Sequence, residues 1–357
     1  MKKSILFIYN IPAPYRVDFL NLISEHQEIK VFFEKENAAH RNKEWLNNKI
    51  HFPYTFINAS FKNHIKLLYM IFKTKHIVLG GYSTPLSIFL IIYMKILRKR
   101  YILNADGGFL KKESKFNFIL KKFLISSATY WLSSGKETNK YLEKYGADTE
   151  RIYIYPFTSI KKSNIELIDD DQKNNLKLKA LGSTKKIVLY VGSFIPIKGV
   201  EKLIEAATYC DEFNFLFIGG TPNEQQKQLS KNKENIIFKS HLSKEELKKY
   251  YQMADLFVFP TQGDVWGLVI NEAQSYGLPI ITTDKCIAGL ELLESDTGQI
   301  IPHDLPNEEL ASLIEKTFKD IESFDTNKII KSASRYTLEN MSDRHIEIFE
   351  EINRGDR

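Results

Sequence analysis

At 357 residues, with 43% hydrophobic and 26% charged residues, the chain is long enough for about two folded domains and is not disordered. Its net charge of +6 divides into +13 for residues 1–160 and −7 for the remainder, which predicts that the first half faces an anionic partner, namely membrane lipid, nucleic acid or an acidic acceptor. Only Cys210 and Cys286 are present, which excludes a disulfide framework and favours a reducing compartment.

In the first half, short β-branched or aromatic runs predict strands, and a helical pattern follows each of them. The chain opens with basic residues and an apolar run, but that run stops at Asn10 without a cleavage site, so we expect a strand rather than a leader. Residues 85–94 are too few to span a bilayer and favour a core helix with a solvated edge. The expected strands cover residues 5–9, 29–33, 76–79, 101–104, 129–132 and 151–155.

A polar, charge-rich segment, residues 159–185, predicts a linker that includes an entry helix. The second half then repeats the first, and residues 337–352 predict an amphipathic terminal helix. Strands that alternate with helices at this spacing imply parallel sheets wound on both faces, and two such sets predict two Rossmann-like domains. The expected strands of the second half cover residues 186–191, 214–218, 235–238, 254–259, 279–282 and 298–301.

We therefore expect an α/β fold with two domains and a separate terminal helix. The first domain covers residues 1–160, the second covers residues 161–336, and the helix in residues 337–357 packs back on the first domain.

The sharpest motif follows the expected strand at 254–259. Asp264 falls in a loop and Glu272 about one turn inside a helix that begins near Gly267, so that two carboxylates flank a helix amino terminus. Free backbone amides at such an end bind phosphate, and neighbouring carboxylates accept hydrogen bonds from sugar or ribose hydroxyls. The structural alternative is a capping aspartate with an exposed helical glutamate.

A second motif follows the strand at 186–191, where a Gly192-Ser193 loop leads to Lys198 just before a helix. A lysine at this place neutralises a diphosphate as it becomes a leaving group, although a solvated surface lysine is the alternative. After the next strand, the pair Gly219-Gly220 lets the backbone approach a ligand, which by itself is a weak signal.

Taken in order, these motifs resemble those of family 4 of the glycosyltransferases. That family has a strand followed by G-R-x-x-x-x-K-G, then G-x-G, then an E-x7-E block that ends in E-A-x-x-x-G-x-P-V. The corresponding stretches are residues 192–199, 218–220 and 264–280, and residues 11–17 resemble the family's opening. The resemblance implies the GT-B fold, in which two Rossmann-like domains face a central cleft, and the retaining transfer of a sugar from a nucleotide-sugar.

The same resemblance implies roles for single residues. Glu272 holds the ribose hydroxyls of the donor, and Asp264, in place of the first motif glutamate, contacts the sugar ring. Lys198 binds the diphosphate together with the amides of Gly267 and Leu268. Asp264 is one methylene shorter than the family's glutamate, and the family's arginine is replaced by a serine, so one phosphate cation is missing. The donor-binding set is completed by Gly192, Ser193, Gly219, Trp266 and, as a substitute cation from the opposite domain, Arg16.

In the first domain, Asp106 aligns with a region where the family often has a histidine near the transferred sugar, so it is a candidate contact to donor or acceptor. An aspartate that shapes the following Gly-Gly turn is an equal alternative. No metal is expected, because the eight histidines show no metal spacing and the acidic run 169–171 has no strand before it. The expected co-substrate is a nucleotide-sugar, and a UDP-sugar is favoured.

The first half also contains a candidate membrane surface. Apolar and cationic side chains that alternate at helical spacing suit an anionic bilayer, whereas no nucleic-acid reader motif accompanies the charge. We therefore expect a cytoplasmic enzyme at the inner face of the membrane, acting on a glycan or lipid-linked acceptor in polysaccharide or glycolipid assembly. A catalytically inert GT-B scaffold and a sugar-nucleotide epimerase are the alternatives. The residues of this surface are Lys111, Lys112, Lys115, Lys121 and Lys122 among Phe116, Ile119, Leu120 and Phe123.

Overall fold

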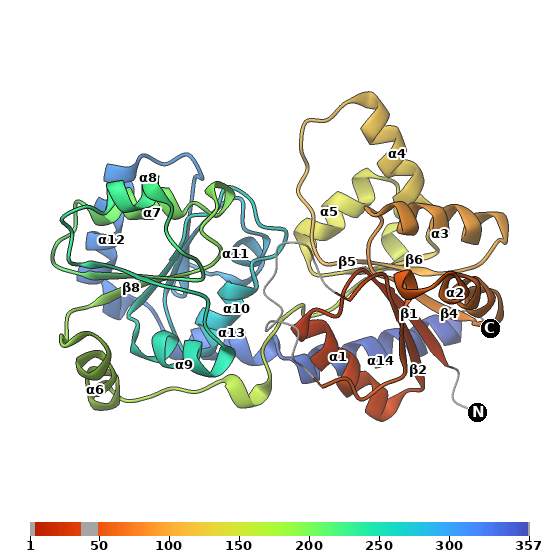
Figure 1. The fold of residues 1–357 in the computed structure, drawn as a ribbon, viewed down its shortest axis with the longest axis horizontal. Coiled ribbons are helices and arrows are strands. Elements are labelled where there is room, and N and C mark those ends of the chain that lie inside the picture. Colours follow the sequence, from red (N-terminus) through yellow and green to blue (C-terminus); the bar gives the residue numbers. More distant parts are fainter. Residues whose placement is uncertain (1–3, 37–48, 356–357) are drawn as a thin grey trace. The chain divides into compact units, whose positions relative to one another are not determined.

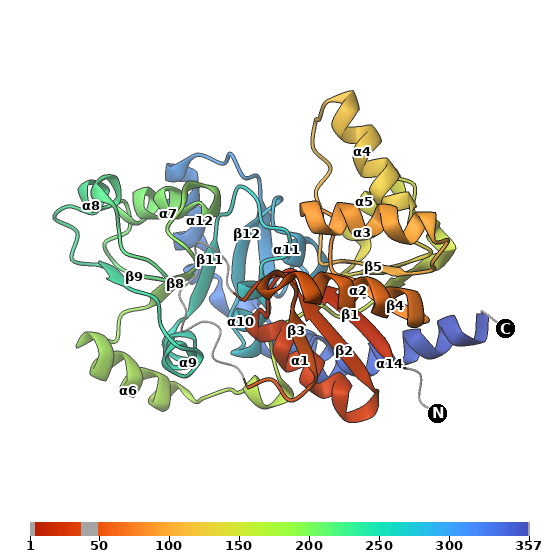
Figure 2. The same ribbon diagram turned by 45° about the vertical axis from the view of Figure 1, so that its right-hand side comes forward.

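A computed structural model describes residues 4–36 and 49–355. The chain divides into two compact units, of which unit 1 comprises Met1–Ser159 and Tyr336–Arg357, and unit 2 comprises Ile160–Arg335. In each unit a parallel sheet lies between two layers of helices (Figures 1 and 2). The α/β fold class expected from the alternation of strands and helices is therefore confirmed.

In the described part of unit 1, seven strands form one parallel sheet in the order β3-β2-β1-β4-β5-β6-β7. All six strands expected from the sequence are present, and no strand end differs from the expected one by more than one residue. The short edge strand β3 was not predicted. The strands are β1 (Ile5–Tyr9), β2 (Ile29–Phe33), β3 (Tyr54–Phe56), β4 (His76–Leu79), β5 (Ile102–Ala105), β6 (Tyr130–Ser133) and β7 (Ile152–Ile154).

The two faces of this sheet carry different helices (Figure 1). Because side chains alternate along a strand, Leu6 and Ile8 enter a core with α2, α3, α4 and α5, whereas Phe7 contacts Phe349 of α14 with ring centroids 6.1 Å apart. Helix α14 packs against α1. The helices of unit 1 are α1 (Pro14–His26), α2 (Phe61–Lys73), α3 (Pro85–Ile96), α4 (Lys115–Ser126), α5 (Lys136–Lys144) and α14 (Leu338–Gly355).

Unit 2, in which every residue is described, has six parallel strands in the order β10-β9-β8-β11-β12-β13. All six expected strands are present here as well. The strands are β8 (Ile187–Val191), β9 (Asn214–Ile218), β10 (Ile236–Lys239), β11 (Leu256–Phe259), β12 (Ile280–Thr283) and β13 (Gly298–Ile301).

Helices cover both faces of the unit 2 sheet. Helices α7, α8 and α12 lie on one face, and α9, α10 and α13 lie on the other (Figure 1). The helices are α6 (Asp170–Leu181), α7 (Val200–Ala207), α8 (Glu224–Leu229), α9 (Lys244–Met253), α10 (Leu268–Ser275), α11 (Ile287–Leu292), α12 (Asn307–Lys319) and α13 (Thr326–Arg335).

Two local features explain segments that the sequence left open. The acidic run at 169–171 begins α6, because the Asp169 carboxylate accepts from the Gln172 amide at 2.7 Å in a capping box. The stretch at 85–94 forms α3, which buries Leu90 and Met94 and exposes Phe89, so the prediction of a core helix with an outer edge is confirmed. Within residues 4–36 and 49–355, no helix has the length and apolar character needed to cross a bilayer.

Candidate functional site

Two glycine-containing loops meet at the carboxyl edge of the unit 2 sheet. Gly192 follows β8 and Gly219 follows β9, and the Gly192 amide donates to the Ile218 carbonyl at 2.9 Å. Gly219 has a φ of +122°, and a side chain there would lie 2.6 Å from the Gly192 carbonyl oxygen. Only glycine satisfies both conditions. The edge therefore offers main-chain groups at this point, as a loop that accepts a phosphate or a sugar does.

Lys198 and Asp264 form an ion pair at the same edge. Lys198 ends a 3-10 turn, Pro196–Lys198, and its Nζ donates to Asp264 Oδ2 at 2.6 Å. The two side chains are 23% and 21% exposed, so a ligand can reach both of them. Gly199 fixes the lysine loop against β11, because a side chain at Gly199 would lie 1.9 Å from the Pro260 carbonyl oxygen. The pair is held by backbone packing and remains open to solvent.

The end of β12 holds the Asp264 loop in place. The Asp264 amide donates to the Lys285 carbonyl at 2.9 Å, and Asp264 and Cys286 form an isolated parallel bridge. Gly267 has a φ of +98°, and a side chain there would lie 2.6 Å from Cys286 Sγ. Burial, and secondarily the charge of Asp264, raise the pKa of the Cys286 thiol to about 12, so it packs as a neutral group. The clamp fixes the amino end of α10, where the amides of Gly267 and Leu268 precede the first intrahelical bonds.

Glu272 lies one turn inside α10 and has a partner that the sequence did not indicate. Tyr251, in α9, donates its hydroxyl to Glu272 Oε2 at 2.9 Å and stacks on Tyr276 with ring centroids 5.4 Å apart. Burial, and secondarily the charge of Glu272, raise the pKa of Tyr251 well above its usual value, so the hydroxyl keeps its proton. The apolar face of α9 predicts that Tyr251 is buried, but only the tertiary structure shows which carboxylate it meets.

The remaining candidates of unit 2 are divided between solvent and core. Ser193 is exposed in its loop, and Leu268 is half-buried at the start of α10. Trp266 is 3% exposed, and its indole N–H donates to Asn271 Oδ1 at 2.8 Å. The indole ring therefore packs in the core, and a ligand at this edge meets the main chain of Trp266 rather than its side chain.

The edge thus combines a cation, two carboxylates and the amides at the start of α10, all from the loops after the strands and the first turns of that helix. Lys198 and the amides at the start of α10 suit a phosphate, since both present positive charge or N–H donors. Asp264 and Glu272 are acceptors for hydroxyl groups. Ligands of doubly wound sheets bind at this carboxyl edge, so the position agrees with the chemistry.

Comparison with known proteins identifies this domain. The family model described as "Glycosyl transferases group 1" matches residues 171–336. Unit 2 belongs to the group 1 glycosyltransferases. The resemblance expected from the glycine, lysine and carboxylate motifs is therefore confirmed, and those motifs lie inside the matched segment.

Two curated relatives are similar to parts of this chain. An uncharacterized 41.2 kDa protein in the cps region of Klebsiella pneumoniae is 30% identical over 118 residues, which are 32% of each chain. The lipopolysaccharide glucosyltransferase WaaG of Escherichia coli is 23% identical over 199 residues, which are 53% of each chain. The chain thus spans between a third and about half of the length of these relatives.

A solved structure extends the similarity of fold beyond the group 1 domain. HepE of Anabaena, in complex with UDP and glucose, matches with a TM-score of 0.75 over 98% of this chain and 100% of its own, at 15% identity. A structure of WaaG matches with a TM-score of 0.66 over 96% of this chain and 99% of its own. Both matches cover nearly the whole chain, which has one parallel sheet in each of its two units, so the expected GT-B fold is confirmed.

Arg16 and Asp106 lie in unit 1, outside the group 1 domain, and form a second polar cluster. Arg16 Nη2 donates to Asp106 Oδ2 at 2.5 Å, and the guanidinium carbon lies 3.9 Å from the centre of the Tyr9 ring. Asn104 Nδ2 and the Tyr155 hydroxyl donate to Asp106 Oδ1 at 3.1 and 2.9 Å. Three donors therefore hold a carboxylate that is 25% exposed. That Arg16 replaces the missing phosphate cation stays a prediction, and its own unit already provides a carboxylate partner.

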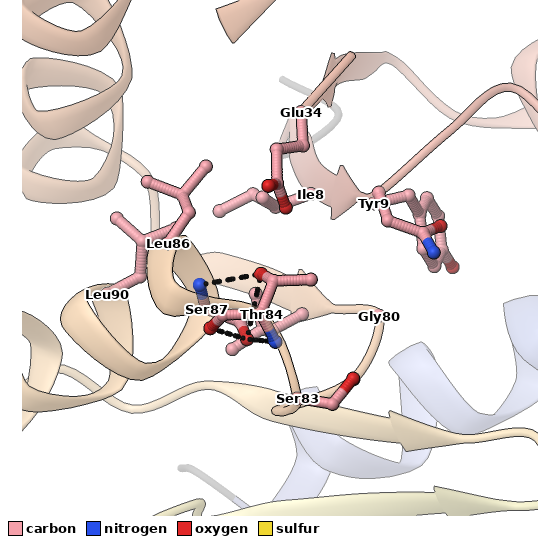
Figure 3. Close-up of a pocket in the computed structure, with 12 residues that line it drawn as sticks. Ile8, Tyr9, Glu34, Gly80, Ser83, Thr84, Leu86, Ser87 and Leu90 are labelled. Atoms are coloured by element: carbon pink, nitrogen blue, oxygen red, sulfur yellow. Dashed lines mark hydrogen bonds between the residues drawn. The ribbon is translucent and has the colours of Figure 1, made fainter. Parts of the chain in front are cut away.

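A small cavity lies near this cluster, at the carboxyl ends of β1 and β4 in unit 1. Figure 3 shows that Glu34 points into it from one side and Thr84, at the start of α3, from the other. Its volume of about 30 Å³ admits one or two water-sized groups rather than a sugar ring. Hydroxyl-bearing and carboxylate side chains around so small a space suit a single ligand hydroxyl.

Proposed function

We propose that the protein is a retaining glycosyltransferase that moves a sugar from a nucleotide-diphosphate sugar, with a UDP-sugar as the favoured donor, to a glycan or lipid-linked acceptor. One observation carries this proposal. The Lys198–Asp264 pair, at 2.6 Å, lies at the amino end of α10, with Glu272 one turn further along the same helix. The complex of HepE with UDP and glucose, at 15% identity, supports the choice of nucleotide.

In this proposal, the positively charged and N–H groups of the site bind the diphosphate, and the carboxylates bind hydroxyl groups. Lys198 and the amides of Gly267 and Leu268 stabilise the diphosphate, whose charge grows as the bond to the sugar breaks. Glu272 accepts hydrogen bonds from the ribose hydroxyls, and Asp264 accepts one from the sugar. No protein nucleophile is required, because the departing phosphate oxygen takes the acceptor proton on the face from which it leaves. The enzyme then contributes orientation and charge stabilisation.

Asp106 belongs to the acceptor side of the proposal. Its carboxylate is held by Arg16, Asn104 and Tyr155, so the orientation of its solvent-exposed part is fixed. A carboxylate that already accepts from three donors serves as a hydrogen-bond acceptor that orients a hydroxyl.

The proposed acceptor is presented at an anionic membrane, because unit 1 carries a broad apolar and cationic surface. None of α2, α3 and α4 contains an acidic residue. The helices adjoin one another, since Lys99 Nζ lies 6.0 Å from the Phe72 ring and Lys95 Nζ lies 4.2 Å from the Phe123 ring. We call these helices the α2–α4 surface. Its exposed large apolar side chains are Phe61, Ile65, Tyr69, Phe72, Phe89, Ile92, Ile96, Phe116, Ile119, Leu120 and Phe123.

Sugar transfer is tested by incubating the protein with a panel of UDP-sugars and glycosyl-carrier lipids and analysing the products. We expect one donor to be consumed and its sugar to appear on the lipid with the anomeric configuration of the donor. A folded protein that binds no nucleotide-sugar in calorimetry would be an inert scaffold. A product that is a stereoisomer of the nucleotide-sugar itself would establish an epimerase instead.

Membrane binding is tested by sedimentation with anionic and with neutral vesicles. We expect binding to anionic vesicles that weakens with salt, because the Debye length falls from about 10 Å at 0.1 M to about 3 Å at 1 M. Replacement of the exposed α4 lysines Lys115 and Lys122 should weaken it further. Lys121 should matter less, because it is paired with Glu113 at 2.7 Å. Equal partitioning into both vesicle types, or none, contradicts this part of the proposal.

A further inference from the structure

A cavity of about 470 Å³ opens at the amino end of α4, within unit 1. This volume is in the range of ordinary small-ligand sites. The loop that leaves β5 after Asp106 supplies two of its lining residues, α4 supplies three, and α5 supplies one. The lining residues are Lys111, Glu113, Lys115, Phe118, Ile119 and Lys144.

Three lysine side chains give the lining of the cavity a net positive charge. Lys111, Lys115 and Lys144 are exposed, and none of them forms an ion pair in the part of the chain that the structure describes. Glu113 also lines the cavity, but its carboxylate accepts from the Tyr145 hydroxyl and is paired with Lys121 at 2.7 Å, while Lys144 acts on it only as a more distant charge. Exposed lysines that surround an opening and form no ion pair of their own are suited to bind phosphate.

The other part of the lining is apolar and continuous with the α2–α4 surface. Phe118 packs on Tyr145 with ring centroids 5.5 Å apart, and Ile119 is 65% exposed. Phe116, on the same helix, is 74% exposed. A ligand in this cavity therefore meets cations on one side and apolar groups on the other. That combination matches a molecule with a phosphate joined to an aliphatic part.

We propose that this cavity binds the phosphate head group of an anionic membrane lipid. Lys111, Lys115 and Lys144 surround the phosphate, and Phe118 and Ile119 contact the glycerol and the first acyl carbons. This inference rests on the proposed membrane-associated function and gives it a defined lipid site, beyond a general attraction between charges. The cavity shares the β5–α4 loop with Asp106, so a lipid bound there also anchors the loop that follows the acceptor-side carboxylate.

The test compares two triple variants of the full chain. The first changes Lys111, Lys115 and Lys144 to glutamine. The control makes the same change at Lys35, Lys49 and Lys136, which are exposed lysines of unit 1 outside the cavity lining. Both variants lose the same net charge, so the change in net charge cannot by itself account for a difference between them. At about 1 kcal/mol for each lysine near the surface, the cavity variant should bind phosphatidylglycerol vesicles roughly 100-fold more weakly than the wild type.

Two further comparisons decide between sources of the ligand. Control vesicles contain oleic acid in place of phosphatidylglycerol and are adjusted to the same zeta potential, so their negative charge comes from carboxylates and not from phosphates. The wild type should bind the phosphatidylglycerol vesicles more tightly than these control vesicles. The cavity variant should bind both kinds equally. Dihexanoyl-phosphatidylglycerol below its micelle concentration should bind more tightly than glycerol phosphate, which lacks the acyl chains. Equal losses in the two triple variants, or equal binding of the two soluble probes, overturn the proposal.

Titration of UDP-glucose separates this inference from the proposed enzyme function. The cavity variant should bind UDP-glucose as the wild type does, because its three lysines lie outside the group 1 domain. Donor binding without a lipid preference would refute the lipid site and leave the transferase. A lipid preference without any donor binding would retain the lipid site and refute the transferase.

Discussion

Removing the hydroxyl of Tyr251 isolates the interaction that orients Glu272. In Tyr251→Phe the ring keeps its place, because it is 2% exposed and stacks on Tyr276 at 9° between ring planes. Only the hydrogen bond to Glu272 Oε2, at 2.9 Å, is lost. Since burial and Glu272 hold the pKa of Tyr251 well above its usual value, the hydroxyl is a donor at neutral pH, and the variant removes a donor at every accessible pH.

The expected size of the effect follows from the environment of the bond. A hydrogen bond to a charged group contributes about 1.5 to 3 kcal/mol to stability. Glu272 is half-buried, so water can replace part of the interaction, and we expect a loss near 1.5 kcal/mol in the free energy of unfolding. If the same carboxylate holds the ribose, its loss of orientation should weaken UDP binding by about tenfold, which corresponds to roughly 1.4 kcal/mol.

Calorimetric titration with UDP and urea unfolding measure the two effects separately. Tyr250→Phe is the matched control, because Tyr250 is the neighbouring residue on α9, is 7% exposed, and has Lys249 Nζ 5.1 Å from its ring. It should leave UDP affinity unchanged. Glu272→Ala should largely abolish donor binding, and the double variant with Tyr251→Phe should lose no more than Glu272→Ala alone, because the two residues act through one contact.

Two results would refute this reasoning. If Tyr251→Phe lowers stability but leaves UDP affinity at the wild-type value, Tyr251 supports the fold and does not position Glu272. If Glu272→Ala is folded and binds UDP normally, Glu272 is not part of the donor site.

Three other predictions follow from the structure. Lys198→Ala should lower kcat more than it raises KM, because diphosphate charge grows in the transition state, and steady-state kinetics that show an unchanged kcat would indicate uniform binding instead. Gly267→Ala should weaken UDP binding and cost about 1 to 3 kcal/mol of stability, since its φ is +98° and a Cβ would lie 2.6 Å from Cys286 Sγ; calorimetry and urea unfolding that match the wild type would contradict the clamp. Burial lowers the pKa of His345 to about 4, so its neutral form stabilises the fold above its unfolded pKa of 6.5 and this stability is lost as pH falls toward 4. Urea unfolding should show a loss of about 2 kcal/mol between pH 7 and pH 5 that is absent in His345→Phe, and an equal loss in both proteins would exclude His345 as the cause.

Local sequence patterns determined the fold class and the motifs of the group 1 domain. A run such as residues 187–191 contains only apolar and β-branched side chains, and a strand buried on both faces requires such a composition wherever it lies in the sheet. The glycines at 192, 219 and 267 could be recognised in the sequence as loop glycines that follow strands, because a positive φ, as at 219 and 267, is a property of the local backbone. Order and spacing then sufficed to recognise the family.

Contacts between distant segments required the tertiary structure. The edge strand β3 has only three residues and an exposed Tyr54, so its sequence shows no alternation of buried and exposed side chains from which a strand could be predicted. It is a strand only because it pairs with β2. Tyr251 meets Glu272 across two helices, and Lys198 meets Asp264 although 66 positions separate them. The cationic cavity likewise depends on Lys144 of α5 lying beside the start of α4. Periodicity tells which side chains are buried or exposed, whereas the identity of a partner depends on how the sheet orders its strands and on which helices it brings together.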